Sequence, residues 1–192
     1  MGVPIDFAGP GELQLDALAV PLARPVERSR LSGRPSELAA SGEFRGDRAE
    51  ALVVHAGGDQ DGRIVLAGLG PRAEVELDSF RTAAAVTAQA LARVGGTLGW
   101  QLDESLPVSL PDQVRALVDG TVLGGYTPGR WKTQDLDKQP RQIERIVIVN
   151  AETPELRDAA ERAALVGLTS PATMSTSVSS ARRSRSTPAE SR

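Results

Sequence analysis

The sequence contains no cysteine and only one histidine, His55. The lack of cysteine excludes a disulfide framework and any thiolate metal site. A single histidine also excludes zinc motifs such as H-E-x-x-H, which place two imidazoles on one helix face. We therefore expect a protein of a reducing compartment, the cytoplasm, whose fold depends on its hydrophobic core.

Aromatic residues are scarce, at 3% of the 192 residues. Hydrophobic residues nevertheless make up 40% of the chain and charged residues 24%, as in an ordinary globular protein. The core must therefore be built mainly from small aliphatic side chains. The length suits one domain with a proper core and is too short for two large domains.

The chain also has no long hydrophobic run and no excess of basic charge. No segment approaches the roughly 20 apolar residues that cross a bilayer, and the N-terminus lacks the basic and apolar regions of a signal peptide. The formal net charge is -3 and the isoelectric point is near 5.3, which gives no general attraction to nucleic acid or to anionic membranes. We expect neither a membrane nor a nucleic acid among the partners.

The segment from Gly42 to Gly70 organises the predicted fold. It holds two short apolar runs, residues 51–56 and 64–69, separated by a Gly- and Asp-rich cluster at residues 57–62. This pattern predicts two strands joined by a turn. The runs are almost continuously apolar, which favours strands covered on both faces, in the middle of a sheet.

Further strands and helices are predicted on both sides of this segment. Helices begin at the N-cap Asp78, at Pro111 and at Thr153, and each is followed by apolar residues at helical spacing. Residues 24–37 are predicted to be a loop and residues 38–44 a helical turn. The other predicted strands are residues 15–22, 97–102 and 146–149. Alternating strands and helices predict an α/β fold, with a mixed or mostly parallel sheet sandwiched by helices.

The C-terminal residues 168–192 differ from the rest, because they are rich in Ser, Thr and Arg and lack hydrophobic periodicity. Such a segment cannot bury enough apolar area to offset its ordering entropy. We expect a folded domain over residues 1–167 and a disordered tail over residues 168–192. The tail arginines at 182, 183 and 185 would bind phosphates only weakly and in a salt-sensitive way, so we interpret them as solvated.

Candidate site residues are few. Gly68-Leu69-Gly70 after a strand could cradle a phosphate, but position 73 is Ala and Pro71 lacks a donor, so a plain strand-to-helix turn is favoured. His55 is interpreted as a structural side chain of its strand. The acidic residues at loops and strand edges show no ligand spacing and are interpreted as solvated surface: Asp16, Asp59, Asp61, Asp103 and Glu104.

Several segments in order resemble the N-terminal domain of the leucyl (cytosol) aminopeptidase family. Gly42-Glu43-Phe44-Arg45-Gly46 is similar to the family's G-x-F-x-G segment, and ALVVHA and IVLAGLGPRAEV are similar to the strands that follow it. Leu123-Gly124-Gly125-Tyr126 with Arg130-Trp131-Lys132-Thr133 resembles a G-x-Y-x-F-x-x-Y-K-T region, with Pro128 and Trp131 in place of the usual residues. The resemblance covers roughly residues 10 to 167.

The resemblance implies a macro-domain-like N-terminal domain that does no chemistry. In that family a larger C-terminal domain binds two divalent metal ions, manganese or zinc, and removes N-terminal amino acids from peptides, and the full-length enzymes are typically hexamers. None of that domain's motifs can be matched here. We therefore expect a chain that is inactive alone and assign it no catalytic, cofactor-binding or metal residue. A macro-like module for a nucleotide or ADP-ribose is the alternative, and weak nucleic-acid binding through the tail is a third.

The sequence after Leu168 suggests why the resemblance stops. The family continues with L-A-R-D-x-V-N, whereas this chain has Thr169 to Thr176, TSPATMST. Codons for these residues, read one base out of phase, include Leu-Ala-Arg-Asp-His-Val-Asn. We hypothesise a frameshifted and truncated aminopeptidase. Sequencing the gene tests this hypothesis. It is refuted if the shifted reading frame downstream does not encode an aminopeptidase catalytic domain.

Overall fold

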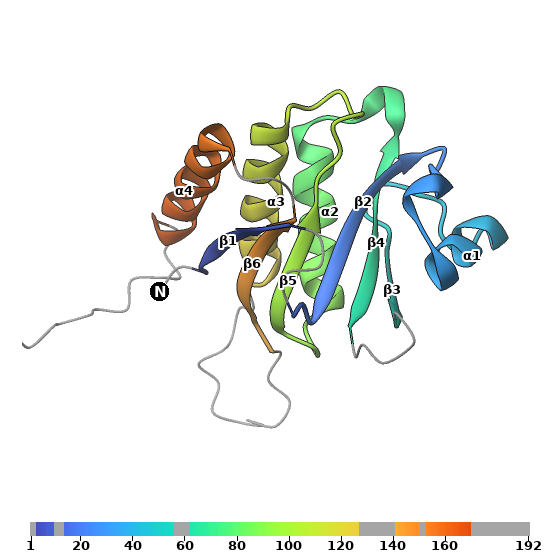
Figure 1. Ribbon diagram of the computed structural model, residues 1–192, viewed down its shortest axis with the longest axis horizontal. Coiled ribbons are helices and arrows are strands. Elements are labelled where there is room, and N and C mark those ends of the chain that lie inside the picture. Colours follow the sequence, from blue (N-terminus) through green and yellow to red (C-terminus); the bar gives the residue numbers. More distant parts are fainter. Residues whose placement is uncertain (1–2, 10–13, 56–61, 127–140, 150–152, 170–192) are drawn as a thin grey trace, which may run out of the picture.

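The computed structural model describes residues 3–9, 14–55, 62–126, 141–149 and 153–169 (Figure 1). These residues form a six-stranded sheet with the order β1-β6-β5-β2-β4-β3. All neighbouring strands are parallel except the antiparallel pair β3–β4. The strands are β1 (Ile5–Ala8), β2 (Ala17–Arg24), β3 (Ala51–His55), β4 (Arg63–Pro71), β5 (Gly96–Gln101) and β6 (Ile143–Val149). The predicted α/β class with a mostly parallel sheet is confirmed.

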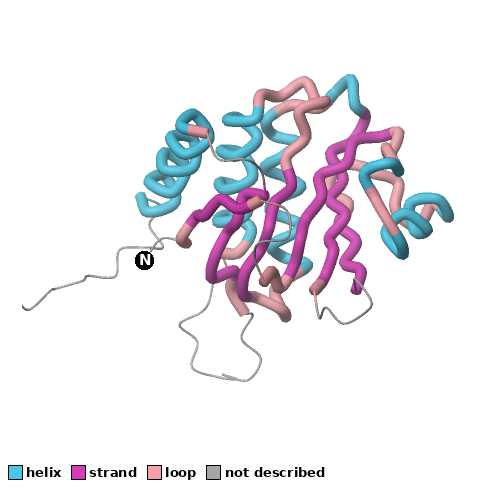
Figure 2. Tube along the Cα trace, viewed as in Figure 1, coloured by secondary structure: helices cyan, strands magenta, loops and turns pink. Residues whose placement is uncertain are grey.

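The described residues also contain four α-helices and two 3-10 turns. Helices α2, α3 and α4 lie on one face of the sheet, whereas α1 lies near the β2, β4 and β3 end of the other face (Figures 1 and 2). The helices are α1 (Gly33–Ser41), α2 (Leu77–Ala90), α3 (Leu110–Gly124) and α4 (Pro154–Thr169), and the 3-10 turns are η1 (Arg28–Arg30) and η2 (Arg72–Glu74).

Strand alternation divides the core into two clusters. On β2, Ala17 and Ala19 point toward the α2–α4 layer, whereas Val20 and Leu22 point to the other face, where they pack with Phe44. Alternate side chains of a strand face opposite sides of the sheet, so an almost continuously apolar strand is needed when both faces are covered.

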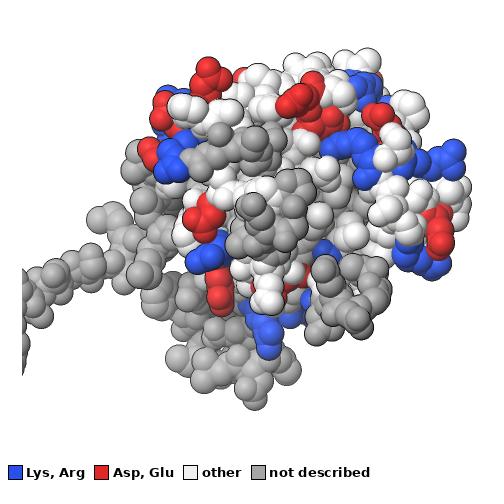
Figure 3. Space-filling model, viewed as in Figure 1, with Lys and Arg blue, Asp and Glu red and all other residues white. Residues whose placement is uncertain are grey.

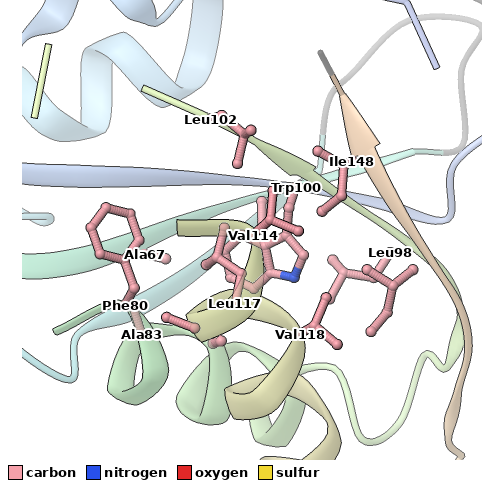
Figure 4. Packing of buried hydrophobic residues seen from close by; sticks show 14 of the residues in the cluster. Ala67, Phe80, Ala83, Leu98, Trp100, Leu102, Val114, Leu117, Val118 and Ile148 are labelled. Atoms are coloured by element: carbon pink, nitrogen blue, oxygen red, sulfur yellow. The ribbon is translucent and has the colours of Figure 1, made fainter. Parts of the chain in front are cut away.

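The larger cluster is centred on Trp100, the one tryptophan in the described residues, which is fully buried (Figure 4). Its indole N–H donates to Thr121 Oγ1 at 3.1 Å, so the polar end of the ring is satisfied inside the core. Small residues bring α3 close to α2. A Cβ at Gly120 would lie 2.3 Å from the backbone oxygen of Arg81, and one at Gly124 would lie 2.4 Å from the backbone of Ala85.

The structure corrects several sequence-based predictions. The predicted loop over residues 24–37 contains η1 and the start of α1, and the helical turn predicted at 38–44 is instead the end of α1, closed by Gly42 with a φ of 81°. The predicted N-cap Asp78 lies inside α2, whose N-cap is Glu76 in a capping box with Ser79. The other two predicted helix starts are correct to within one residue, because α3 begins at Leu110, just before Pro111, and α4 begins at Pro154, just after Thr153.

The two strands predicted for the middle of the sheet, β3 and β4, differ in their environment. β4 is buried along most of its length between β2 and β3, as predicted, but β3 is an edge strand and only Val54 on it is buried. The expectation of two strands in the middle of the sheet was therefore half wrong. The turn cluster between them, apart from Gly62, and the tail beyond Thr169 lie outside the described residues.

Candidate functional site

The two glycine motifs of the sequence are the G-x-F-x-G segment of residues 42–46 and Gly68-Leu69-Gly70. The second motif packs against the loop that begins in the first. The backbone N–H of Gly68 donates to Glu50 O at 2.7 Å, and that of Gly70 donates to Gly46 O at 2.9 Å. A Cβ at Gly68 would lie only 2.0 Å from the Asp47 carbonyl oxygen, so glycine is needed there for the loop to approach. These N–H groups are used inside the protein and do not point at a ligand. Gly68-Leu69-Gly70 nevertheless lies within β4, which ends at Pro71, so the strand-to-helix turn predicted at these residues is wrong and begins only after them.

The loop on the other side of this contact, residues 44–50, is held at both ends. Phe44 is 1% exposed and packs in the smaller core cluster. The Glu50 carboxylate accepts hydrogen bonds from the backbone N–H groups of Arg45 and Asp47. The Asp47 carboxylate in turn binds Arg24 at 2.6 Å. The G-x-F-x-G segment therefore positions a folded loop on the carboxyl end of β4.

A polar network lies at the carboxyl end of β5. Arg30 Nη1 donates to Asp103 Oδ2 at 2.5 Å, and the guanidinium also binds the carbonyl oxygens of Pro21 and Leu102. Asp103 is 8% exposed. The buried Gln113 accepts from the Asp103 backbone N–H and donates to the carbonyl oxygen of the same residue. Each of these side chains is paired, so the network ties η1 to the loop before α3 and leaves none of these groups free for a substrate.

This network corrects the interpretation of Asp103 as solvated surface. Its partner Arg30 is 73 residues away in the sequence, and no local signal marks such a pair. Asp16 and Glu104 are exposed, as predicted, although Asp16 also accepts a hydrogen bond from the Thr97 N–H at 2.7 Å. Asp59 and Asp61 lie outside the described residues.

His55 lies exposed at the end of the edge strand β3, opposite Arg63 of β4. The apolar run that contains it suggested a covered position, which is wrong. Within the described residues, no group of three or more His, Asp or Glu side chains is arranged to hold a metal ion. The described residues Asp16, Asp103 and Glu104 are therefore not part of such a group.

Asp119 is a titratable residue that sequence reasoning missed. It lies on α3 with only 13% of its side chain exposed, and its carboxylate is 3.8 Å from Arg81 Nε on α2. Burial raises its pKa above the usual 3.8, although the positive charges of Arg81 and Arg115 oppose this shift. The residue bridges two packed helices, so its perturbed pKa reflects helix packing and does not mark a reaction centre. An aspartate among the apolar positions of the α3 sequence was the available signal.

Charged side chains of both signs are interspersed on the visible face of the molecule, and they do not gather into one basic patch (Figure 3). None of the helices in the described segments combines the length and apolar character that a bilayer crossing needs.

Comparison with known proteins decides the family. Residues 15–135, more than half of the chain, match the model of the cytosol aminopeptidase family, N-terminal domain. The chain belongs to the cytosol aminopeptidase family. The match includes β2 to α3 and therefore both glycine motifs and the polar network, so these features are part of the cytosol aminopeptidase N-terminal domain. The resemblance inferred from the sequence is confirmed.

Individual relatives agree with this assignment. The chain is 29% identical over 164 residues to a probable cytosol aminopeptidase of Solibacter usitatus (strain Ellin6076), and the alignment covers 84% of this chain and 32% of that protein. A mutant of tomato leucine aminopeptidase has a similar fold, with a TM-score of 0.66 and 19% identity over 86% of this chain and 36% of that one.

A similar fold is also found in the bottromycin maturation enzyme BotP, solved in complex with Mn, with a TM-score of 0.58 and 21% identity over 77% of this chain and 28% of that one. The chain thus spans about a third of the length of these relatives. None of the three is described as a nucleotide-binding or ADP-ribose-binding protein, so the macro-like alternative gains no support.

Proposed function

We propose that residues 1–167 form the non-catalytic N-terminal domain of a cytoplasmic aminopeptidase and that this chain is inactive alone. The observation that carries the proposal is the match of residues 15–135 to the N-terminal domain of the family, together with the 32% coverage of the Solibacter relative. In this proposal the remaining two thirds of such an enzyme supply the chemistry. The chain's own role is in assembly and in shaping access to the active site.

The geometry supports a structural role. The Gly68 and Gly70 N–H groups are used by the 44–50 loop, and the Arg30–Asp103 pair is closed by further hydrogen bonds. The proposed partner is the catalytic domain of the family, which would hold the two divalent ions, manganese or zinc. We further propose a homo-oligomer, a hexamer as in full-length members, once that domain is present.

An assay with a chromogenic leucine substrate and added manganese tests the proposal. We expect no turnover by the purified chain, because the proposed metal ligands belong to the other domain. The Solibacter aminopeptidase under the same conditions is the positive control. Turnover that co-purifies with the chain through successive columns would contradict the proposal.

A further inference from the structure

The loop of residues 44–50 is folded around a carboxylate of its own. The backbone N–H of Arg45 donates to the two Glu50 carboxylate oxygens at 3.2 and 3.1 Å, and the N–H of Asp47 donates to Glu50 Oε2 at 3.0 Å. Between them Gly46 has a φ of 77°, a left-handed conformation that lets neighbouring N–H groups converge. Convergent backbone N–H groups of this kind form an anion-binding nest.

Other contacts hold the backbone of this nest in place. The carbonyl oxygens of Gly46 and Glu50 accept hydrogen bonds from Gly70 and Gly68 of β4, and Phe44 is anchored in the core. The nest therefore does not depend on the Glu50 side chain alone for its position. A preformed site loses less free energy on binding than one that must be ordered by its ligand.

The charges beside the nest also suit an anion. The Arg45 guanidinium is exposed and has no ion pair in the part of the chain that the structure describes. The negative charge of Asp47 is compensated by Arg24 at 2.6 Å. An incoming carboxylate would thus meet two backbone donors and a nearby positive charge.

We propose that residues 44–50 are a carboxylate-binding site, which the native chain fills with Glu50 and which accepts a small free carboxylate when that side chain is removed. The site goes beyond the proposed role in a larger aminopeptidase, because it needs only this loop and β4. Its ligand class is the monocarboxylates, with acetate or formate small enough to replace the end of a glutamate side chain.

The test is chemical rescue of Glu50→Ala in the full chain. Loss of the charge-assisted hydrogen bonds is expected to lower the melting temperature by roughly 5–10 °C. Acetate is then added in place of chloride at constant ionic strength. It should restore at least half of the lost melting temperature, and the effect should saturate as the acetate concentration rises. The amide NMR signals of Arg45 and Asp47 should shift over the same acetate range. A folded variant with no saturable shift at these two amides would overturn the proposal.

Two control variants separate this effect from general salt stabilisation. Glu37→Ala removes an exposed carboxylate that forms an ion pair with Arg34 on the surface. Acetate should raise the melting temperature of this variant by no more than it raises that of the wild type. Glu50→Gln keeps an acceptor oxygen in the nest, so its loss in melting temperature should be less than half of the loss in Glu50→Ala. Acetate should not raise the melting temperature of Glu50→Gln. If Glu50→Ala is unfolded without acetate, recovery of its fold on addition of acetate supports the proposal, and an alanine variant that stays unfolded in acetate refutes it.

Discussion

Two buried threonines in the core differ in whether their hydroxyl groups have hydrogen-bond partners. Thr87 and Thr121 are both fully or nearly fully buried on the packed faces of α2 and α3. The Thr121 hydroxyl accepts from Trp100 Nε1 and donates to the Leu117 carbonyl oxygen. The Thr87 hydroxyl has no partner in the described part of the structure. A buried hydroxyl without a partner costs free energy on folding.

Thr87→Val is expected to raise the free energy of unfolding by about 1 kcal/mol, because valine keeps the shape and removes the unpaired hydroxyl. Urea unfolding measures the change. The matched control is Thr121→Val, which leaves the Trp100 indole N–H unpaired and is expected to lower the free energy of unfolding by roughly 1–3 kcal/mol. Equal losses in both variants would show that the Thr87 hydroxyl has a partner after all.

Asp119→Asn tests the consequence of a raised pKa. Since the folded-state pKa of Asp119 lies above the usual 3.8, the protonated form favours folding, and this stabilisation is lost as pH rises through the folded-state pKa. Asparagine does not titrate. The difference in unfolding free energy should therefore move in favour of the variant as pH rises from about 4 to 7. A difference that is flat, or that moves toward wild type, would contradict the raised pKa.

At the scale of elements, the contact between the two glycine motifs fixes the loop of residues 44–50 on β4. Gly68→Ala would place a Cβ 2.0 Å from the Asp47 carbonyl oxygen, which is backbone and cannot rotate away. We expect a loss of roughly 2–4 kcal/mol in unfolding free energy from the forced shift. The control is Gly62→Ala, where the nearest atom is 3.6 Å away and the change should stay within about 1 kcal/mol. Similar changes in unfolding free energy at both positions would mean that the loop can move away from the new Cβ without a loss of stability.

Elements with long, regular apolar spacing could be predicted from the sequence, and short or interrupted ones could not. α2 and α3 carry such spacing, and β6 was predicted from its β-branched run at residues 146–149; the type of each element was correct. β1 is only four residues long, too short to show alternation. α1 was missed because Gly33 and Pro35 read as loop residues, although proline is tolerated in the first turn of a helix, where its missing N–H has no helical acceptor.

The contacts that define the candidate site required the folded structure. The glycines and Phe44 were visible as motifs, but the pairing of Gly68 with Glu50 and of Gly70 with Gly46 depends on how the loop docks. The Arg30–Asp103 pair joins residues that only the sheet brings together. Residue type predicted a surface carboxylate there, and tertiary packing determined a buried one.

At the scale of the whole molecule, the buried core lies within residues 17–163. A chain that ends at Thr169, the last residue of α4, is expected to melt within about 1–2 °C of the full chain, because it keeps every described core contact. Differential scanning calorimetry of both chains measures this. A control chain that ends at Thr153 loses α4 and the burial of Leu156 and Ala160, and it should melt well below the other two. A large loss at Thr169 would show that the tail contributes to the fold.

The arrangement of strands also sets an order in which the chain can assemble. The antiparallel pair β3–β4 joins residues that all lie within 51–67. The hydrogen bond that docks the adjoining loop on β4 joins residues 46 and 70. The central strand β2 instead pairs with β5 through residues 17–19 and 98–100, which are roughly three times as far apart along the chain as Gly46 and Gly70. Closing a longer loop costs more entropy before any contact rewards it. The hairpin and its docked loop can therefore form first, as a template on which the parallel strands are added later and more slowly.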